Sequence, residues 1–221
     1  MNNKIYSIAI DGPAGAGKST IAKLVSKKLN IEYIDTGAMY RALTLKVLRN
    51  NLNPLNKNDV IQISKNTEID FIKNHIYLDG EQVDNEIRDN IINNNVSYIA
   101  IIEEIRFNMV KLQQKMAKSK SVVMDGRDIT TVVLPNADFK FFITASVEER
   151  GRRRYKEIKE KGKTDITLVQ IIDEIKKRDD IDSNREISPL KIADDAFVLD
   201  TTNMTVDECV NSIISIVKGG I

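Results

Sequence analysis

The chain has 221 residues, with 33 basic and 32 acidic side chains, so its charge gives no general attraction to nucleic acid or to a membrane surface. Its length suits one α/β domain with a sizeable core, and no apolar stretch is long enough to span a bilayer. No signal peptide is visible, and the single cysteine, Cys209, excludes an internal disulfide and is expected to pack in the core. We therefore expect a cytosolic monomer without nucleic-acid or membrane partners.

The first predicted strand, residues 5–10, leads directly into a glycine-rich loop and then into a helix with apolar residues at helical spacing up to Leu29. The loop completes the pattern G-x-x-x-x-G-K-[ST] with Gly12, Pro13, Ala14, Gly15, Ala16, Gly17, Lys18, Ser19 and Thr20. Such a loop points its N–H groups at a polyphosphate. Lys18 would bridge the outer phosphates of ATP, and the Ser19 hydroxyl would bind Mg²⁺. The alternative is a strand–helix turn that binds nothing.

Further buried strands are predicted at residues 32–34, 121–124, 139–144 and 196–199, with helical patterns between them. This alternation predicts a five-stranded parallel sheet covered by helices on both faces, in a three-layer α/β fold. All of these strands except 139–144 are followed by an aspartate: Asp11, Asp35, Asp125 and Asp200. They would lie at the carboxyl edge of the sheet, where open α/β sheets bind ligands.

Residues 65–95 interrupt this alternation. Between residues 68 and 83 apolar residues alternate with polar ones, and turn signals occur at Lys73-Asn74 and Asp79-Gly80. This pattern predicts a small antiparallel meander within an insertion, which leaves residues 1–64 and 96–221 as the core. His75 has no second histidine to share a metal, so we expect a surface or turn residue.

An arginine-rich helix follows the fourth strand, with the sequence RGRRRYK from Arg150 onward, and it runs toward a predicted turn at Lys161-Gly162-Lys163. A solvated helix face would explain many such charge runs. Here the arginines come just after a strand of a triphosphate-binding sheet. We therefore favour a lid, at about residues 150–185, that closes arginines on the transferring phosphates.

The tetrapeptide Asn56-Lys57-Asn58-Asp59 matches the guanine-reading pattern of GTPases. No strand precedes it and an amphipathic helix follows it, so we interpret it as a helix start capped by Asn58 or Asp59. A kinase for a small phosphorylated acceptor is the better hypothesis. Arginines near the sheet edge would grip a monophosphate with two donors each. The candidates are Arg41, Arg127 beside Asp128, and Arg178 and Arg185 around Asp182.

Over nearly its whole length the sequence resembles the bacterial cytidylate kinases. The matching blocks are IDGPAGAGKST, IDTGAMYRA, DGEQV with EIR, VVMDGRDITTVVLP, EERGRRRY, KKRDDIDSNREISPL and DDAFVLDTT. The resemblance implies a P-loop nucleoside monophosphate kinase with an NMP-binding insertion and a lid. It implies transfer of the ATP γ-phosphate to CMP or dCMP, by direct in-line attack.

The same resemblance implies roles for particular residues. Those implied to hold the acceptor phosphate are Thr36, Arg41, Arg127 and Arg185. Those implied to read cytosine are Ser97, Arg106 and Asp128. Arg178 and Asp182 would contact the sugar, and Lys18, Arg127, Arg150 and Arg154 would act in transfer.

The chain also departs from the family pattern. Thr130 stands where the family usually has glycine, which would strain the loop if that position needs a positive φ. Ser188 replaces the commoner alanine before Pro189. Other hypotheses remain: a kinase for UMP, AMP or shikimate, a nucleic-acid-binding module that uses the arginine run, or an ATP sensor without turnover.

Overall fold

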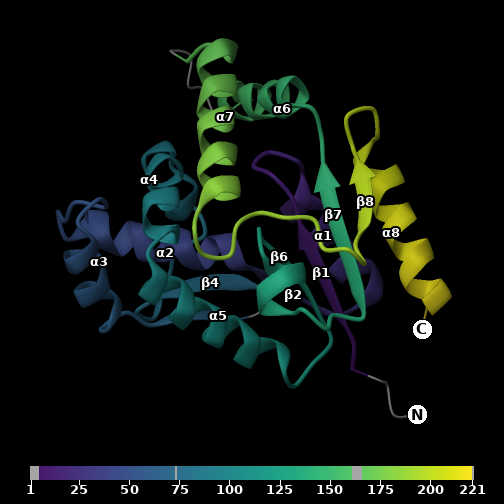
Figure 1. Cartoon of the computed structure of the whole chain (residues 1–221), viewed down its shortest axis with the longest axis horizontal. Coiled ribbons are helices and arrows are strands. Elements are labelled where there is room, and N and C mark those ends of the chain that lie inside the picture. Colours follow the sequence, from purple (N-terminus) through teal and green to yellow (C-terminus); the bar gives the residue numbers. More distant parts are fainter. Residues whose placement is uncertain (1–4, 73, 161–165, 221) are drawn as a thin grey trace.

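The computed structural model describes residues 5–72, 74–160 and 166–220 (Figure 1). Within these residues a parallel five-stranded sheet has the order β2-β6-β1-β7-β8. Its strands are β1 (Ser7–Asp11), β2 (Glu32–Asp35), β6 (Val122–Asp125), β7 (Phe139–Thr144) and β8 (Phe197–Asp200). Ile8 of the central strand lies opposite Val123 on one side and Phe139 on the other. The predicted parallel sheet is confirmed, with strand ends shifted by one or two residues.

Helices follow the strands and cover both faces of the sheet. They are α1 (Lys18–Leu29), α2 (Thr36–Arg49), α3 (Lys57–Ser64), α4 (Asn90–Ala100), α5 (Glu103–Ala117), α6 (Val147–Glu160), α7 (Leu168–Asn184) and α8 (Val206–Gly220). Two further short helical segments are η1 (Glu86–Arg88), between β5 and α4, and η2 (Ile129–Val133), between β6 and β7. None of the helices in the described residues is long and apolar enough to cross a membrane.

The pleat of the central strand divides the core between the two faces. Ile8 and Ile10 pack against α1 and α8, whereas Ala9 between them packs against η2 and the end of α5. This follows from the alternation of side chains along a strand. Cys209 of α8 is fully buried in the first of these clusters, as its apolar surroundings predicted. The three layers of the predicted fold are therefore present.

A small antiparallel sheet, separate from the parallel one, confirms the predicted meander. Its order within the described residues is β3-β4-β5, with β3 (Ile69–Ile72), β4 (His75–Leu78) and β5 (Glu81–Gln82). Of the two predicted turns, Lys73 lies outside the described residues, while Asn74, Asp79 and Gly80 have positive φ. His75 is exposed on β4, with Nδ1 2.9 Å from a carboxylate oxygen of Asp84.

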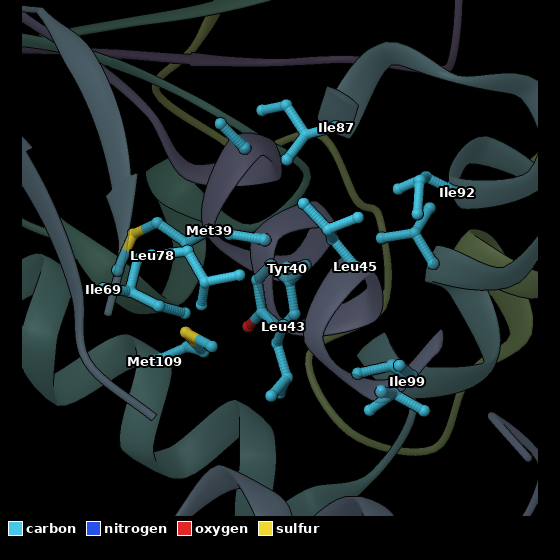
Figure 2. Close-up of a cluster of buried hydrophobic side chains, with 14 of the residues drawn as sticks. Met39, Tyr40, Leu43, Leu45, Ile69, Leu78, Ile87, Ile92, Ile99 and Met109 are labelled. Carbon is cyan, nitrogen blue, oxygen red and sulfur yellow. The ribbon is translucent and has the colours of Figure 1, made fainter. Parts of the chain in front are cut away.

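Helix α2 packs between this small sheet and helix α4. Figure 2 shows its side chains between Ile69 and Leu78 on one side and Ile92 and Ile99 on the other. The side chains from α2 that it labels are Met39, Tyr40, Leu43 and Leu45. The same buried cluster continues into α5, so it extends on both sides of residues 65–95. It supports the first two turns of α2, where the predicted site residues Thr36 and Arg41 lie.

One predicted cap is wrong. Helix α3 does begin at Lys57, but its N-cap is Asn56, whose side chain accepts hydrogen bonds from the N–H groups of Asn58 and Asp59. A residue inside the first helical turn cannot cap its own helix, because its backbone is already helical. The matched tetrapeptide is thus a helix start.

Helices α6 and α7 form a hairpin at the carboxyl ends of the strands, where the arrow of β7 points in Figure 1. Ile158 of α6 packs on Ile171 and Ile175 of α7. The range predicted as a lid contains these helices, and its predicted turn at residues 161–163 lies outside the described residues.

Candidate active site

A cavity of about 890 Å³ lies at the carboxyl edge of the parallel sheet. It is lined by the glycine-rich loop, the starts of α1 and α2, helix α4, the loop after β6, and the facing sides of α6 and α7. Among its described lining residues are ten basic and seven acidic side chains. A local excess of positive charge therefore exists in a chain whose net charge is +1.

The glycine-rich loop leaves β1 in a conformation that only glycine allows. Gly12 has φ 148°, and a Cβ there would lie 1.9 Å from the carbonyl oxygen of Ile143 on β7. Lys18 opens α1 and donates from Nζ to the carbonyl oxygen of Pro13 at 2.8 Å. Burial, together with the nearby Arg127 guanidinium, lowers the pKa of Lys18 to about 7. The strand–loop–helix context required for phosphate binding is present.

Ser19 faces the buried carboxylate of Asp125 at the end of β6. Its Oγ donates to Oδ2 of Asp125 at 2.9 Å, and the Tyr33 hydroxyl donates to Oδ1 at 2.8 Å. Burial and the neighbouring Asp35 raise the pKa of Asp125, and burial beside Asp125 raises that of Tyr33. In the described residues no group of three or more His, Cys, Asp or Glu side chains could hold a metal ion. A hydroxyl and a carboxylate alone fit Mg²⁺ that arrives with a nucleotide, because this ion keeps phosphate and water ligands.

Asp35, the N-cap of α2, organises two arginines. Its Oδ2 accepts from Arg41 of the same helix and from Arg88 of η1, each at 2.9 Å. Burial opposes ionisation of Asp35, but the two guanidinium groups hold its pKa below the ordinary value. Thr36 donates to the carbonyl oxygen of Asp125 at 2.7 Å, which fixes the start of α2 against β6.

A second arginine cluster surrounds Asp182 of α7. Arg127 donates from Nε to this carboxylate at 2.9 Å, while Arg178 and Arg185 lie 4.0 Å from it. Burial, and then the Arg127 charge, lowers the pKa of Arg178 to about 10. Some buried guanidinium nitrogens have no hydrogen-bond partner among the described residues: Nε of Arg41, Arg106 and Arg178, and Nη2 of Arg185. Unpaired buried donors are costly, so an anion that accepts from them would be held strongly.

Arg106 and Asp128 form a buried ion pair in the lining of the cavity. Arg106 comes from α5 and also donates to the carbonyl oxygen of Ala100 at 3.0 Å. Its guanidinium lies 5.7 Å from the centre of the Tyr40 ring. Burial opposes the charge of Arg106, but Tyr40 and Asp128 raise its pKa. Ser97 of α4 lines the same cavity.

The arginines of α6 have different surroundings. Arg154 lines the cavity and donates to Glu157 and to Asn90 of α4, both at 3.1 Å. Arg153 also lines it and donates to the hydroxyl and carbonyl oxygens of Thr201. Arg150 is buried and absent from the described lining, because its guanidinium is directed at the backbone of the glycine-rich loop.

The position of Thr130 is not strained, since its φ is not positive. Its hydroxyl and N–H donate to Asp11 Oδ2 at 2.6 and 2.7 Å, and the Ile129 N–H donates to Oδ1. The other departure, Ser188, does have a positive φ of 51°, and its carbonyl oxygen accepts from Arg185 Nε at 2.6 Å.

Most of the predicted site residues meet in the one cavity. Those in its lining are Ala14, Gly15, Gly17, Lys18, Ser19, Thr20, Thr36, Arg41, Ser97, Arg106, Arg127, Asp128, Arg154, Arg178, Asp182 and Arg185. The predicted residues outside it are Gly12, Pro13, Ala16 and Arg150. Three further lining residues, Asp35, Asp125 and Arg88, had no individual role among the predictions from sequence. The position of each aspartate at a strand end was the available signal for the first two, and Arg88 ends the block EIR.

Known proteins match this chain over nearly its whole length. A family profile described as cytidylate kinase matches residues 8–219. A protein named cytidylate kinase from Clostridioides difficile is 55% identical over 208 residues, which cover 94% of this chain and 96% of that protein. One of the same name from Caldanaerobacter subterraneus is 51% identical over 218 residues, covering 99% and 97%. An uncharacterised protein from Eubacterium ventriosum, of known crystal structure, shares the fold with a TM-score of 0.53 at 14% identity and covers 98% of this chain and 99% of its own.

Proposed function

This chain belongs to the cytidylate kinase family, and we propose that it transfers the γ-phosphate of ATP to CMP or dCMP, giving ADP and CDP or dCDP. The observation that carries the proposal is the set of unpaired guanidinium donors beside a glycine-rich loop in one cavity. A polyphosphate on the loop and a monophosphate on the arginines would face each other there. Phosphoryl transfer needs little more than such positioning and charge neutralisation.

ATP would bind with its phosphates on residues 12–20, the N–H groups of the loop and Lys18 pairing with them. A bound Mg²⁺ would neutralise charge on the phosphates. Ser19 and Asp125 would be its protein partners, because their oxygens lie together beside Lys18. Lys18 would leave the Pro13 carbonyl and regain a full positive charge on a phosphate.

The acceptor phosphate would bind to Thr36, Arg41, Arg127 and Arg185, with Arg88 as an additional donor. Arg178 and Asp182 would contact the sugar. Asp128 would accept from the cytosine amino group, while Arg106 donates to the ring nitrogen and carbonyl and Ser97 lies beside the base. Uracil presents a carbonyl in place of that amino group, so the Asp128 carboxylate would repel it.

Residues 65–95 would serve as the NMP-binding insertion, and α6 with α7 as the lid that excludes water. Of the two lid arginines predicted to act in transfer, Arg154 lines the cavity and Arg150 does not, so Arg154 would neutralise charge there. Arg127 would neutralise charge from the side of the parallel sheet. A monomer in the cytoplasm stays a prediction, which gel filtration and cell fractionation test.

A coupled assay of ADP release tests the proposal, with Mg-ATP as donor and CMP, dCMP, UMP, AMP or GMP as acceptor. We expect turnover with CMP and dCMP, and at least tenfold less with UMP, from the loss of a buried polar contact. Similar rates with UMP would still support a nucleoside monophosphate kinase but would refute the role of Asp128 in reading cytosine. No ADP release with any of these acceptors, despite ATP binding, would favour an ATP sensor or an acceptor outside this set.

A further inference from the structure

Arg150 and Asp179 hold the backbone N–H and carbonyl groups of Ala14, in the glycine-rich loop, from two different helices. Arg150 of α6 donates from Nη1 to the carbonyl oxygen of Ala14 at 2.8 Å. Asp179 of α7 accepts from the N–H of Ala14 at 3.2 Å. The same Nη1 donates to Oδ2 of Asp179 at 2.6 Å, so the three groups form a closed set of hydrogen bonds.

In this structure the pair is directed away from the cavity in which the phosphates would bind. Arg150 is 6% exposed, and its Nε is bound to the carbonyl oxygen of Ala145 at 2.9 Å. Neither Arg150 nor Asp179 belongs to the described lining of the cavity, whereas Arg153, Arg154 and Arg178 on the same helices do. The Arg150 guanidinium thus donates to protein acceptors and is not part of the cavity lining.

The hairpin and the glycine-rich loop are closely packed beside this pair. A Cβ on Gly15 would lie 3.3 Å from Cβ of Arg150, and one on Gly151 would lie 2.5 Å from the side chain of Ile172 on α7. At this point α6, α7 and the loop have little room to move independently. A change in the position of the hairpin would therefore shift the backbone of Ala14 directly.

We propose that Arg150 and Asp179 are positioning residues that couple the α6–α7 hairpin to the glycine-rich loop through Ala14. By fixing the N–H and the carbonyl oxygen of Ala14, they orient the peptide groups on both sides of this residue, and so the loop that follows, for the donor phosphates. None of the described residues proposed to hold the acceptor hydrogen-bonds to Arg150 or Asp179, so we expect the main effect on the donor half of the site. The kinetic part of this inference rests on the proposed kinase function, whereas the effect on nucleotide binding does not.

Asp179→Asn keeps the size of the side chain and removes its charge, and Arg150→Met keeps the stem that packs on Gly15 and removes the guanidinium. Matched controls are Asp180→Asn on α7 and Arg152→Met on α6, both exposed neighbours. Mg-ADP binding is measured by calorimetry. The KM values of ATP and CMP and the kcat are measured in the coupled assay.

We expect each variant to raise the Kd of Mg-ADP and the KM of ATP about tenfold, the effect of losing one charge-assisted hydrogen bond. The KM of CMP should stay within about twofold, and the double variant should be no worse than either single one, since the residues act as a unit. The controls should match the wild type.

Unchanged Mg-ADP binding in a folded Asp179→Asn variant would overturn the coupling, as would an equal rise in the KM of CMP. If Arg150→Met does not fold, the milder Asp179→Asn still decides the matter, with hydrogen exchange of residues 12–19 as an added readout. Because ADP binding needs no acceptor, the pair is tested even if CMP is not the substrate. Failure of the wild type to use CMP would refute only the proposed function.

Discussion

Replacing Thr130 with valine keeps the branched side chain and removes one donor to a buried carboxylate. The Thr130 hydroxyl donates to Oδ2 of Asp11 at 2.6 Å, and both residues are nearly inaccessible to solvent. A hydrogen bond to a charged group contributes about 1.5–3 kcal/mol, and one between neutral groups about 0.5–1.5 kcal/mol. The cost of the substitution therefore depends on whether Asp11 is ionised.

The pH dependence has a definite sign. Burial raises the pKa of Asp11 to about 6, although hydrogen bonds from Thr130 and Ile129 partly lower it. Because this pKa lies above the ordinary 3.8, the stability contributed by Asp11 is complete below about pH 4 and is lost as the pH rises through about 6. That loss amounts to about 3 kcal/mol. Thr130→Val raises the pKa of Asp11 further, because it removes a hydrogen bond that lowers this pKa. The variant therefore loses more stability than the wild type as the pH rises.

Urea unfolding at pH 5 and pH 8 measures how the stability cost of Thr130→Val depends on pH. We expect Thr130→Val to lower the free energy of unfolding by about 0.5–1.5 kcal/mol at pH 5 and about 1.5–3 kcal/mol at pH 8. The control is Thr131→Val, because the Thr131 hydroxyl is buried without a hydrogen-bond partner in the described residues and its loss should cost little. An equal loss at both pH values, or an equal cost for Thr131→Val, would refute the reasoning.

Further predictions concern the cavity. Lys18, with a pKa of about 7, should take up about 0.9 proton when Mg-ADP binds at pH 8 and almost none at pH 5.5; calorimetry in two buffers of different ionisation enthalpy should show this, and identical heats at pH 8 would contradict it. Asp128→Asn should lower the CMP-to-UMP ratio of kcat/KM about tenfold or more without changing the KM of ATP; an unchanged ratio rules out base reading. Asp125→Asn should raise the Mg²⁺ concentration for half-maximal activity about 10–100-fold; a change in stability alone would argue against a metal role. Gly12→Ala should prevent folding, since its Cβ would lie 1.9 Å from the Ile143 oxygen; a native circular dichroism melt would show that the loop adapts.

The features that the sequence predicted well depend on neighbouring residues. The apolar run before the glycine-rich loop, the helical spacing after it and the turn residues of the meander each act over a few positions, and the structure has the strands and helices they predict. The family resemblance then placed the arginines in one site, and the cavity brings nearly all of them together. Local pattern was sufficient for the strands and helices, whereas the arginine site also needed the family resemblance.

The missed features join residues that are far apart in the chain. The Ser19–Asp125 bond spans 106 positions and the Ala14–Asp179 bond spans 165. No spacing rule connects such residues until the order of the strands is known. Arg150 illustrates the same limit within one helix: the arginine run predicted a lid, but the rotation of α6 decides which guanidinium faces the cavity and which faces the glycine-rich loop.

The carboxylates of the cavity explain how it can hold so many arginines before a substrate arrives. A buried guanidinium without a counter-charge is strongly unfavourable, and Asp35, Asp128 and Asp182 each supply one. Each pairing also leaves some guanidinium N–H groups without a partner, as at Arg41. A phosphate dianion can accept from several of these at once, so it gains bonds without breaking the pairs that orient them. A neutral acceptor would leave the same donors unpaired, and this difference favours a phosphorylated acceptor over a sugar or an alcohol.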